Sequence, residues 1–295
     1  MTQSKVDPKE NEFPRVGLSG FLESEGARSA LIATISSILI FGGFIWFLVS
    51  RPAWPDVRDQ FFSWERARES WPAISNGFIL DIKLFVVGEI LILGLALLIA
   101  VMRSLRGPAF FPLRLMATTF IDVLRGIPVI LLILIMGFGI PALGTTGIFG
   151  RTVLGIDSQL FWGMFAIVLS YSAYTAEVYR SGIDSVHESQ SAGARSLGLS
   201  QAQGMWHVIL PQAIRNVVPA LMNGLISLQK DVALVYILGV REAVRESQIN
   251  VARNFNYTPY VVVAVLFLAL SIPMARFADW YTERDRRRRT IGRVH

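Results

Sequence analysis

The sequence of 295 residues contains no cysteine, which excludes disulfide bonds and thiol chemistry. It contains three histidines, His187, His207 and His295, and their spacing fits no metal site. None of its lysines follows a glycine, so the Gly-Lys-Ser or Gly-Lys-Thr end of a phosphate-binding loop is missing. We therefore expect no catalytic residue, no metal and no bound cofactor in this chain.

Apolar residues are in excess: they form 53% of the chain, against about 45–50% in soluble domains. They are clustered in long uncharged runs, and a helix that crosses a membrane needs about 20 largely apolar residues. The expected fold class is an all-α integral membrane protein with about six transmembrane helices. The runs that indicate it are Leu31–Val49, Ile90–Met102, Ile127–Leu143, Leu160–Ala176 and Val261–Ala275.

The same runs divide the chain into segments. We expect a cytoplasmic tail over 1–28, an extra transmembrane helix over 29–51, an external interfacial loop over 52–73, a five-span core over 74–280 and a basic tail over 281–295. A cleaved signal peptide is disfavoured, because the charged stretch before the first run is too long and no small-x-small site follows it. The six expected spans cover about 31–50, 74–102, 118–141, 160–180, 217–238 and 259–280.

The arginines and lysines indicate the orientation. If the N-terminus lies inside, most of those outside the spans fall in the inner segments, and the run Arg286–Arg289 is among them. Cytoplasmic loops carry such an excess, which also accounts for the net charge of +6 without nucleic-acid binding. We expect a multi-pass plasma membrane protein whose two termini and whose polar loop over 181–216 lie in the cytoplasm.

The polar loop holds the most informative pattern: Ser189–Gly198 is rich in small residues, and Val208–Pro211 follows after nine residues. A generic amphipathic loop would account for the small residues alone. The full spacing resembles the cytoplasmic EAA loop of ABC-importer permeases, Glu-Ala-Ala, three residues, Gly, nine residues, Ile-x-Leu-Pro, which docks on the ATP-hydrolysing subunit. The resemblance implies docking contacts from Gln190, Ala192, Gly193, Ala194, Arg195, Leu197, Gly198, Leu210 and Pro211.

The chemistry of this loop predicts a helix–turn–helix. The small residues Ala192–Ala194 allow another backbone to come close, and Gly198 permits a chain reversal that a residue with a Cβ resists. Ser200 and Gln203 form a capping-box pattern that opens a second short helix. Pro211 suits the start of a helix, where its missing N–H is not needed.

Three further motifs resemble those of polar amino-acid permeases. They are Arg125-Gly126-Ile127-Pro128, the helix end Glu177-Val178-Tyr179-Arg180-Ser181-Gly182, and Leu228-Gln229-Lys230-Asp231 with Gly239-x-x-Glu242. The sequence also departs from the family pattern. Ala192 and Gly193 replace the Glu and first Ala of the EAA motif, Val232-Ala233 replaces Thr-Ser, and the charges of Asp81, Lys83 and Glu89 are unusual.

The resemblance implies the permease subunit of an ATP-driven ABC importer that moves a polar amino acid or similar small solute into the cell by alternating access. The chain is then not an enzyme. Two copies of an ABC ATP-binding subunit would bind ATP and Mg²⁺. A second permease subunit, identical or homologous, and an extracytoplasmic substrate-binding protein would complete the assembly in the lipid bilayer, without a nucleic acid.

Charged residues inside spans are costly, by about 2.5–3.5 kcal/mol each on insertion scales, so they usually face a cavity or a partner. The pathway candidates are Glu89, Arg125, Lys230 and Asp231. Lys230 is expected near the middle of the membrane, either as an anchor for a substrate carboxylate or as a structural partner of Asp231 or Glu89. Two pairs three residues apart, Asp122 with Arg125 and Glu177 with Arg180, are spaced to interact on one helix face.

Two other classes of function are weighed against the importer. A secondary transporter or channel that is not coupled to ATP would show internal repeats or paired broken helices, and the sequence shows no repeat. A membrane-anchored enzyme would need a Ser/His/Asp, Cys/His or metal constellation, and none is found. The sequence does not indicate which solute is carried.

Overall fold

The computed structural model describes residues 25–105, 107–144 and 150–291. They divide into two units, up to Asp59 and from Gln60 onward. The first unit contains α2 (Glu25–Val49), a helix over the segment where the extra span is expected. Its described side chains, from Arg28 onward, are all exposed, as is typical of a helix in lipid. The expected tail over 1–28 lies almost wholly outside the described residues.

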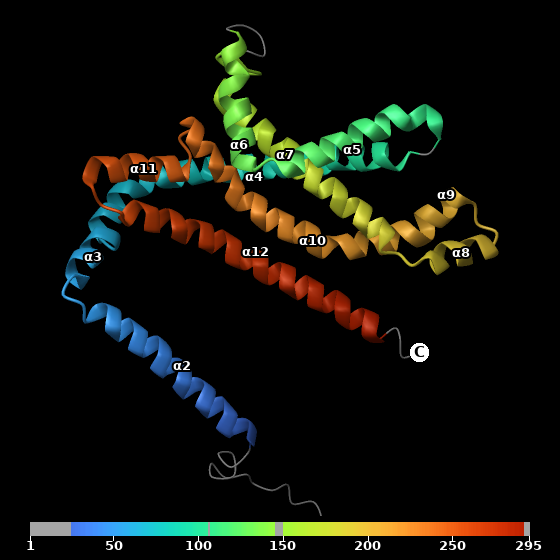
Figure 1. The fold of residues 1–295 in the computed structure, drawn as a ribbon. Helices are drawn as coiled ribbons and strands as arrows, with labels where there is room; N and C mark the ends of the chain where they lie inside the picture. Colours follow the sequence, from blue (N-terminus) through green and yellow to red (C-terminus); the bar gives the residue numbers. More distant parts are fainter. Residues whose placement is uncertain (1–24, 106, 145–149, 292–295) are drawn as a thin grey trace, which may run out of the picture. The chain divides into compact units, whose positions relative to one another are not determined.

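The second unit is a bundle of helices joined by short turns (Figure 1). A two-stranded antiparallel hairpin pairs Thr152 with Asp157 before α7. Short 3₁₀ or π turns are η1 (Pro108–Phe110), η2 (Ile135–Gly139), η3 (Pro141–Leu143), η5 (Met205–Ile209) and η6 (Val232–Leu238). The helices are α4 (Trp64–Ser104), α5 (Phe111–Gly126), α6 (Val129–Leu134), α7 (Ser158–Asp184), α8 (Glu188–Ser196), α9 (Gln201–Gly204), α10 (Leu210–Asp231), α11 (Ala243–Asn254) and α12 (Thr258–Ile291).

The structure changes the expected external loop over 52–73. This segment is mostly helical, because α3 (Trp54–Phe61) and the first turns of α4 occupy it. Ser63 caps α4, and its hydroxyl accepts a hydrogen bond from the Arg66 N–H. The aromatic residues Trp54, Phe61, Trp64 and Trp71 of this segment therefore lie on helices, and Phe62 lies between the two helices.

Four helical stretches of the described residues are long and apolar enough to cross a membrane: 28–49, 54–104, 201–238 and 258–285. A fifth is added if the bent pair 108–126 and 129–143 is one span. The expected span 160–180 lies in α7, which is long enough but carries serines, tyrosines, Glu177 and Arg180. The structure confirms the all-α membrane fold, and the count of six remains a prediction.

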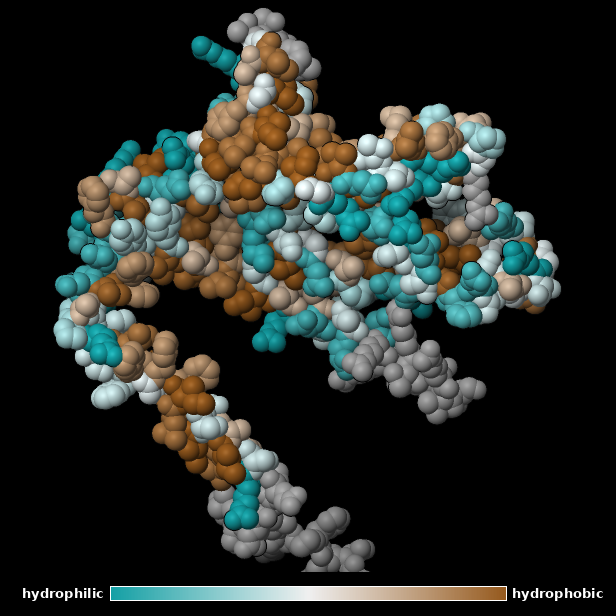
Figure 2. Space-filling view, viewed as in Figure 1, coloured by the Kyte–Doolittle hydropathy of each residue, from teal (hydrophilic) through white to brown (hydrophobic). Residues whose placement is uncertain are grey.

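Helix α7 does not need an apolar surface because its neighbours cover it. It packs against α4, α5, α6 and α10, and its buried residues are mostly small. Small residues allow helices to approach closely in a membrane, where packing replaces the hydrophobic effect as the driving force. Figure 2 shows hydrophobic residues gathered over the middle of the bundle and hydrophilic residues toward its ends. The largest buried cluster includes Ile92, Ile133, Ile167, Leu228 and Val235.

The structure breaks the expected span over 118–141. Helices α5 and α6 are bent by 104° where Ile127 takes an extended conformation before Pro128. A residue before proline is pushed out of the helical region, and proline lacks the N–H that the helix needs. The bend turns α6 so that Ile133 packs into the core, fully buried.

We expect Ile167→Ala to lower the free energy of unfolding by about 2 kcal/mol or more, because it leaves a cavity in the packing around α7. Thermal unfolding of the purified protein in detergent micelles would measure the change. The control is Leu97→Ala, which removes a 57% exposed side chain from α4 and should shift the free energy by about 0.5 kcal/mol or less. Equal effects of the two substitutions would contradict the central position of α7.

Candidate functional site

The loop singled out in the sequence folds as a helix–turn–helix at one end of the bundle (Figure 1). Helix α8 ends at Ser196, and Gly198 reverses the chain with a φ of +79°, in the left-handed region that favours glycine. The Ser200–Gln203 capping box is formed in both directions and starts α9. Pro211 lies in the first turn of α10 as expected, but the chain is already helical from Gln201 through η5.

Small residues allow α8 and α9 to pack closely against each other. Ala194 is buried, and a Cβ on Gly204 would lie 3.4 Å from its methyl group. The Gln212 side chain donates a hydrogen bond of 3.3 Å to Gln190 and thus connects α10 with α8. Gly193 faces open space, so its small size is not needed for this contact.

The outer surface of the loop is apolar at its tip. Leu197 is 83% exposed and Trp206 is 68% exposed. Of the other expected docking residues, Leu210 is half-buried, and Gln190, Ala192, Gly193, Arg195, Gly198 and Pro211 are exposed. An exposed tryptophan and leucine in a polar loop are typical of an interaction surface. The sequence reasoning missed Trp206, although a tryptophan inside a polar loop indicates a contact surface.

An ion-pair network joins α4 and α7 close to this loop. The Glu177 carboxylate pairs with Arg103 of α4 at 2.5 Å and with Arg180 at 2.6 Å, and Arg180 also pairs with Asp184 at 2.6 Å. The spacing-based prediction of a Glu177–Arg180 pair is confirmed. Because α8 begins four residues after Asp184, the network holds the entry to the loop against α4.

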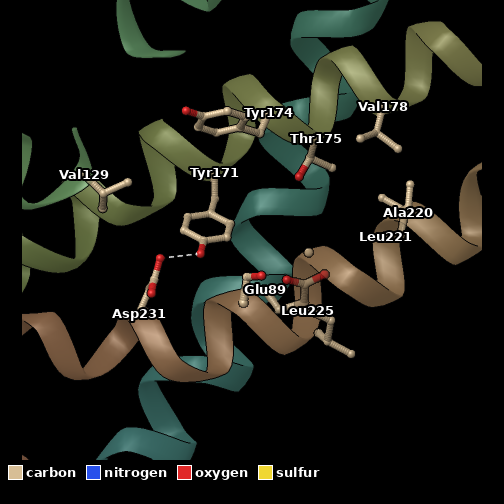
Figure 3. A pocket seen from close by; sticks show the side chains of 12 residues that line it. Glu89, Val129, Tyr171, Tyr174, Thr175, Val178, Ala220, Leu221, Leu225 and Asp231 are labelled. Atoms are coloured by element: carbon tan, nitrogen blue, oxygen red, sulfur yellow. Dashed lines mark hydrogen bonds between the residues drawn. The ribbon is translucent and has the colours of Figure 1, made fainter. Parts of the chain in front are cut away.

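A cavity of about 400 Å³ lies where α4, α6, α7 and α10 meet, within the range of small-molecule sites (Figure 3). The polar side chains that line it are mainly carboxylates and phenols: Glu89, Asp231, Tyr171 and Tyr174. Glu89 of α4 and Asp231 of α10 lie on opposite sides of Tyr171. The Tyr171 hydroxyl donates a hydrogen bond of 2.7 Å to Asp231. The full lining is Glu89, Val129, Tyr171, Tyr174, Thr175, Val178, Ala220, Leu221, Gly224, Leu225, Ser227 and Asp231.

The structure brings together only some of the pathway candidates. Glu89 and Asp231 share the cavity. Arg125 does not line the cavity, but its guanidinium lies 5.6 Å from the centre of the Tyr174 ring, which does. Among the ion pairs of the described residues, none joins Arg125 to Asp122. Lys230 is exposed and is not part of the cavity lining, so its role as a substrate anchor stays a prediction.

Sequence reasoning missed the side of the cavity formed by α7. Tyr171, Tyr174, Thr175 and Val178 recur at spacings of three and four, which places them on one helix face. That pattern was visible in the sequence, but the apolar character of the run hid it. The described residues contain no group of three His, Cys, Asp or Glu side chains placed to hold a metal ion.

Comparison with known proteins identifies similar chains. Residues 93–287 match the profile of the family described as binding-protein-dependent transport system inner membrane component. The arginine transport system permease protein ArtQ of Bacillus subtilis (strain 168) is 31% identical over 72% of this chain and 92% of its own length. The glutamate/aspartate import permease protein GltK of Escherichia coli O6:H1 is 31% identical over 62% of this chain and 80% of its own.

Solved structures agree with the fold. The crystal structure of an amino acid ABC transporter with histidines superposes with a TM-score of 0.64 at 28% identity and covers 73% of this chain and 95% of the matched one. A chain of the methionine ABC transporter MetNI, in an inward-facing conformation, superposes with a TM-score of 0.53 at 17% identity and covers 72% and 95% of the two chains. The second likeness concerns the fold alone.

We expect Gly198→Ala to separate α8 from α10, because a Cβ at a φ of +79° costs about 1–2 kcal/mol. Since the chain has no cysteine, Gln190→Cys and Gln212→Cys can be introduced as a pair and joined with a short thiol cross-linker. The cross-linking yield should fall when Gly198→Ala is added. Gly193→Ala, which meets open space, is the matched control, and an equal yield in both variants would contradict the turn.

Proposed function

The chain belongs to the family of binding-protein-dependent transport system inner membrane components, and from that premise we propose how this permease subunit of an ABC importer works. Its relatives are amino-acid permeases, and it is a multi-pass protein of the plasma membrane. We propose that an ATP-binding subunit hydrolyses ATP, that two copies of it serve the assembly, and that Mg²⁺ binds there. We also propose that a second permease chain and an extracytoplasmic substrate-binding protein complete the assembly.

The α8–α9 loop is the proposed docking surface for the ATP-binding subunit. Its exposed Leu197 and Trp206 and its rigid turn support this assignment. Docking there requires the loop, and with it both termini, to lie in the cytoplasm where ATP is available. The positive charge of the corresponding segments agrees with that orientation.

The connection between loop and cavity carries the mechanism. Helix α7 leads into α8 through a turn of three residues, and α9 continues through η5 into α10. These same helices, α7 and α10, form two sides of the cavity. A rigid-body displacement of the loop therefore moves two cavity walls at once, which is the geometry that alternating access needs.

The charge of the cavity supports a substrate class. Glu89 and Asp231 are acidic, and the lining contains no lysine or arginine. The names of the relatives include arginine, glutamine and glutamate permeases, so they do not select one substrate. Because two carboxylates favour a cation and repel an anion, we propose that the substrate is an amino acid with a positively charged side chain.

We expect Leu197→Asp to release the ATP-binding subunit, because it places a charge at the apolar tip of the proposed docking surface. Co-purification of the two subunits from detergent-solubilised membranes would measure it, with a loss of about tenfold or more in bound ATP-binding subunit. Ser196→Asp, on the neighbouring exposed residue, is the matched control and should bind as the unmodified chain does. Undiminished binding by Leu197→Asp would contradict the docking assignment.

We expect proteoliposomes that contain the whole importer to accumulate labelled L-arginine and L-lysine in preference to L-glutamate. Asp231→Asn should reduce L-arginine uptake by about tenfold or more, the effect of losing one charge-assisted hydrogen bond. Asp122→Asn is the control, because Asp122 is exposed on α5 and does not line the cavity. If L-glutamate is the preferred substrate, or if the control loses as much activity, the proposed substrate class is wrong.

A further inference from the structure

At the end of the bundle opposite the α8–α9 loop, α4 and the start of α11 come into backbone contact (Figure 1). A Cβ on Gly77 would lie 2.6 Å from the backbone nitrogen of Ala243, so no other residue fits at position 77 without a shift. Asp81 follows one turn later on α4 and points at the same helix start. The contact therefore places a carboxyl group where two backbones already touch.

Two carboxyl groups, and not one, cap the N-terminus of α11. Glu242 accepts hydrogen bonds from the Val244 N–H at 2.8 Å and from the Arg245 N–H at 2.6 Å. Asp81 Oδ2 accepts one from the Ala243 N–H at 3.3 Å. Glu242 is fully buried and Asp81 is 2% exposed. The other Asp81 oxygen, Oδ1, is buried without a hydrogen-bond donor in the described part of the chain.

In the part of the chain that the structure describes, no ion pair joins a cation to Asp81 or Glu242. Glu246, one turn along α11, is itself paired with Arg241 at 2.6 Å, and the Arg245 guanidinium donates to Gln248 at 3.1 Å. The face of α12 that packs here contributes apolar side chains such as Val263 and Phe267, and Lys83 of α4 is exposed.

A helix N-terminus carries about half a positive charge, so it balances one carboxylate only in part and two still less. Two ionised carboxylates in a dry contact repel one another, and such a pair holds a proton between its members. Burial raises the pKa of the Glu242 carboxyl to about 7, and the negative charge of Glu246 adds to the rise. The unfilled Asp81 Oδ1 is the oxygen available for that proton.

We propose that Asp81 and Glu242 together bind a single proton, and that this proton holds the N-terminus of α11 against α4. The inference extends the proposed function, because both cavity carboxylates depend on the same elements. Glu89 lies two turns further along α4, and η6 connects Asp231 directly to the turn before α11. Loss of the proton loosens both walls and lowers the rate of transport.

The sign of the pH dependence follows from the raised carboxyl pKa. Stabilisation of the contact is complete below the ordinary carboxyl value of about 4.5 and is lost as the pH rises through about 7. Helix α11 is thus held firmly at pH 5 and loosely at pH 8. Asp81→Asn mimics the protonated state at every pH, because its amide oxygen still accepts from Ala243 and its NH₂ group donates to the Glu242 carboxylate.

The test measures hydrogen exchange of segment 240–250 in the importer reconstituted in nanodiscs, where both faces meet the same buffer. Comparing the unmodified chain with Asp81→Asn at each pH cancels the intrinsic pH dependence of exchange. The exchange rates should be equal at pH 5, and at pH 8 the unmodified chain should exchange about tenfold faster or more. Lys83→Gln, a charge change two residues away on α4, should follow the unmodified chain.

Equal exchange of the unmodified chain and Asp81→Asn at pH 8 would overturn the proposal. So would a slowing of exchange at pH 8 when sodium replaces choline in the buffer, because a metal ion would then fill the site. If Asp81→Asn does not assemble, Asp81→Ser replaces it with the same expectation, because its hydroxyl removes the second charge and can donate to the Glu242 carboxylate, whose two oxygens keep their bonds to Val244 and Arg245. Exchange does not depend on which amino acid is carried, so a wrong substrate class leaves this result intact. If the unmodified chain exchanges faster than Asp81→Asn at pH 8 but takes up no arginine, the shared proton is supported and only the proposed substrate class is wrong.

Discussion

The packing of α7 between α4 and α10 is the contact on which the other features depend. Its buried positions are mostly small, including Ala166, Ser170, Ala173 and Ala176, so its neighbours approach closely on several sides. Near the α8–α9 loop, Glu177 of α7 forms an ion pair with Arg103 of α4. Further along α7, its side chains line the cavity. In the proposed mechanism, a central helix with these two roles would transmit displacement of the α8–α9 loop to the cavity.

Acidic groups are distributed along the bundle in a consistent way. At the loop end, Glu177 is neutralised by two arginines. In the cavity, Asp231 is held by the Tyr171 hydroxyl, which orients the carboxylate without cancelling its charge. At the opposite end, Asp81 and Glu242 share the start of α11. The acidic charge of the cavity lies in the middle, where the proposed cationic substrate would balance it.

Much of this architecture could be predicted from the sequence because the signals are local. Runs of apolar residues predict membrane helices whatever their neighbours, since the bilayer leaves no alternative for the backbone. The turn at Gly198, the Ser200–Gln203 capping box and the Glu177–Arg180 pair each depend on residues within one helical turn, and all three are present. The family resemblance rested on the same local spacings.

Only the tertiary structure decided which side chains meet. A membrane helix is apolar all round, so its sequence does not indicate how it is rotated about its axis; packing against α7 turns Glu89 into the cavity, while Lys230, next to Asp231, is exposed. The sequence likewise did not indicate the bend before Pro128, which directs Ile133 into the core. The sequence by itself thus determined the membrane class and the helix–turn–helix of the loop, because both depend on local patterns. The break at Pro128 and the meeting of Asp81 with Glu242 were decided by the tertiary structure, and the latter required a backbone contact between distant segments that no local pattern encodes.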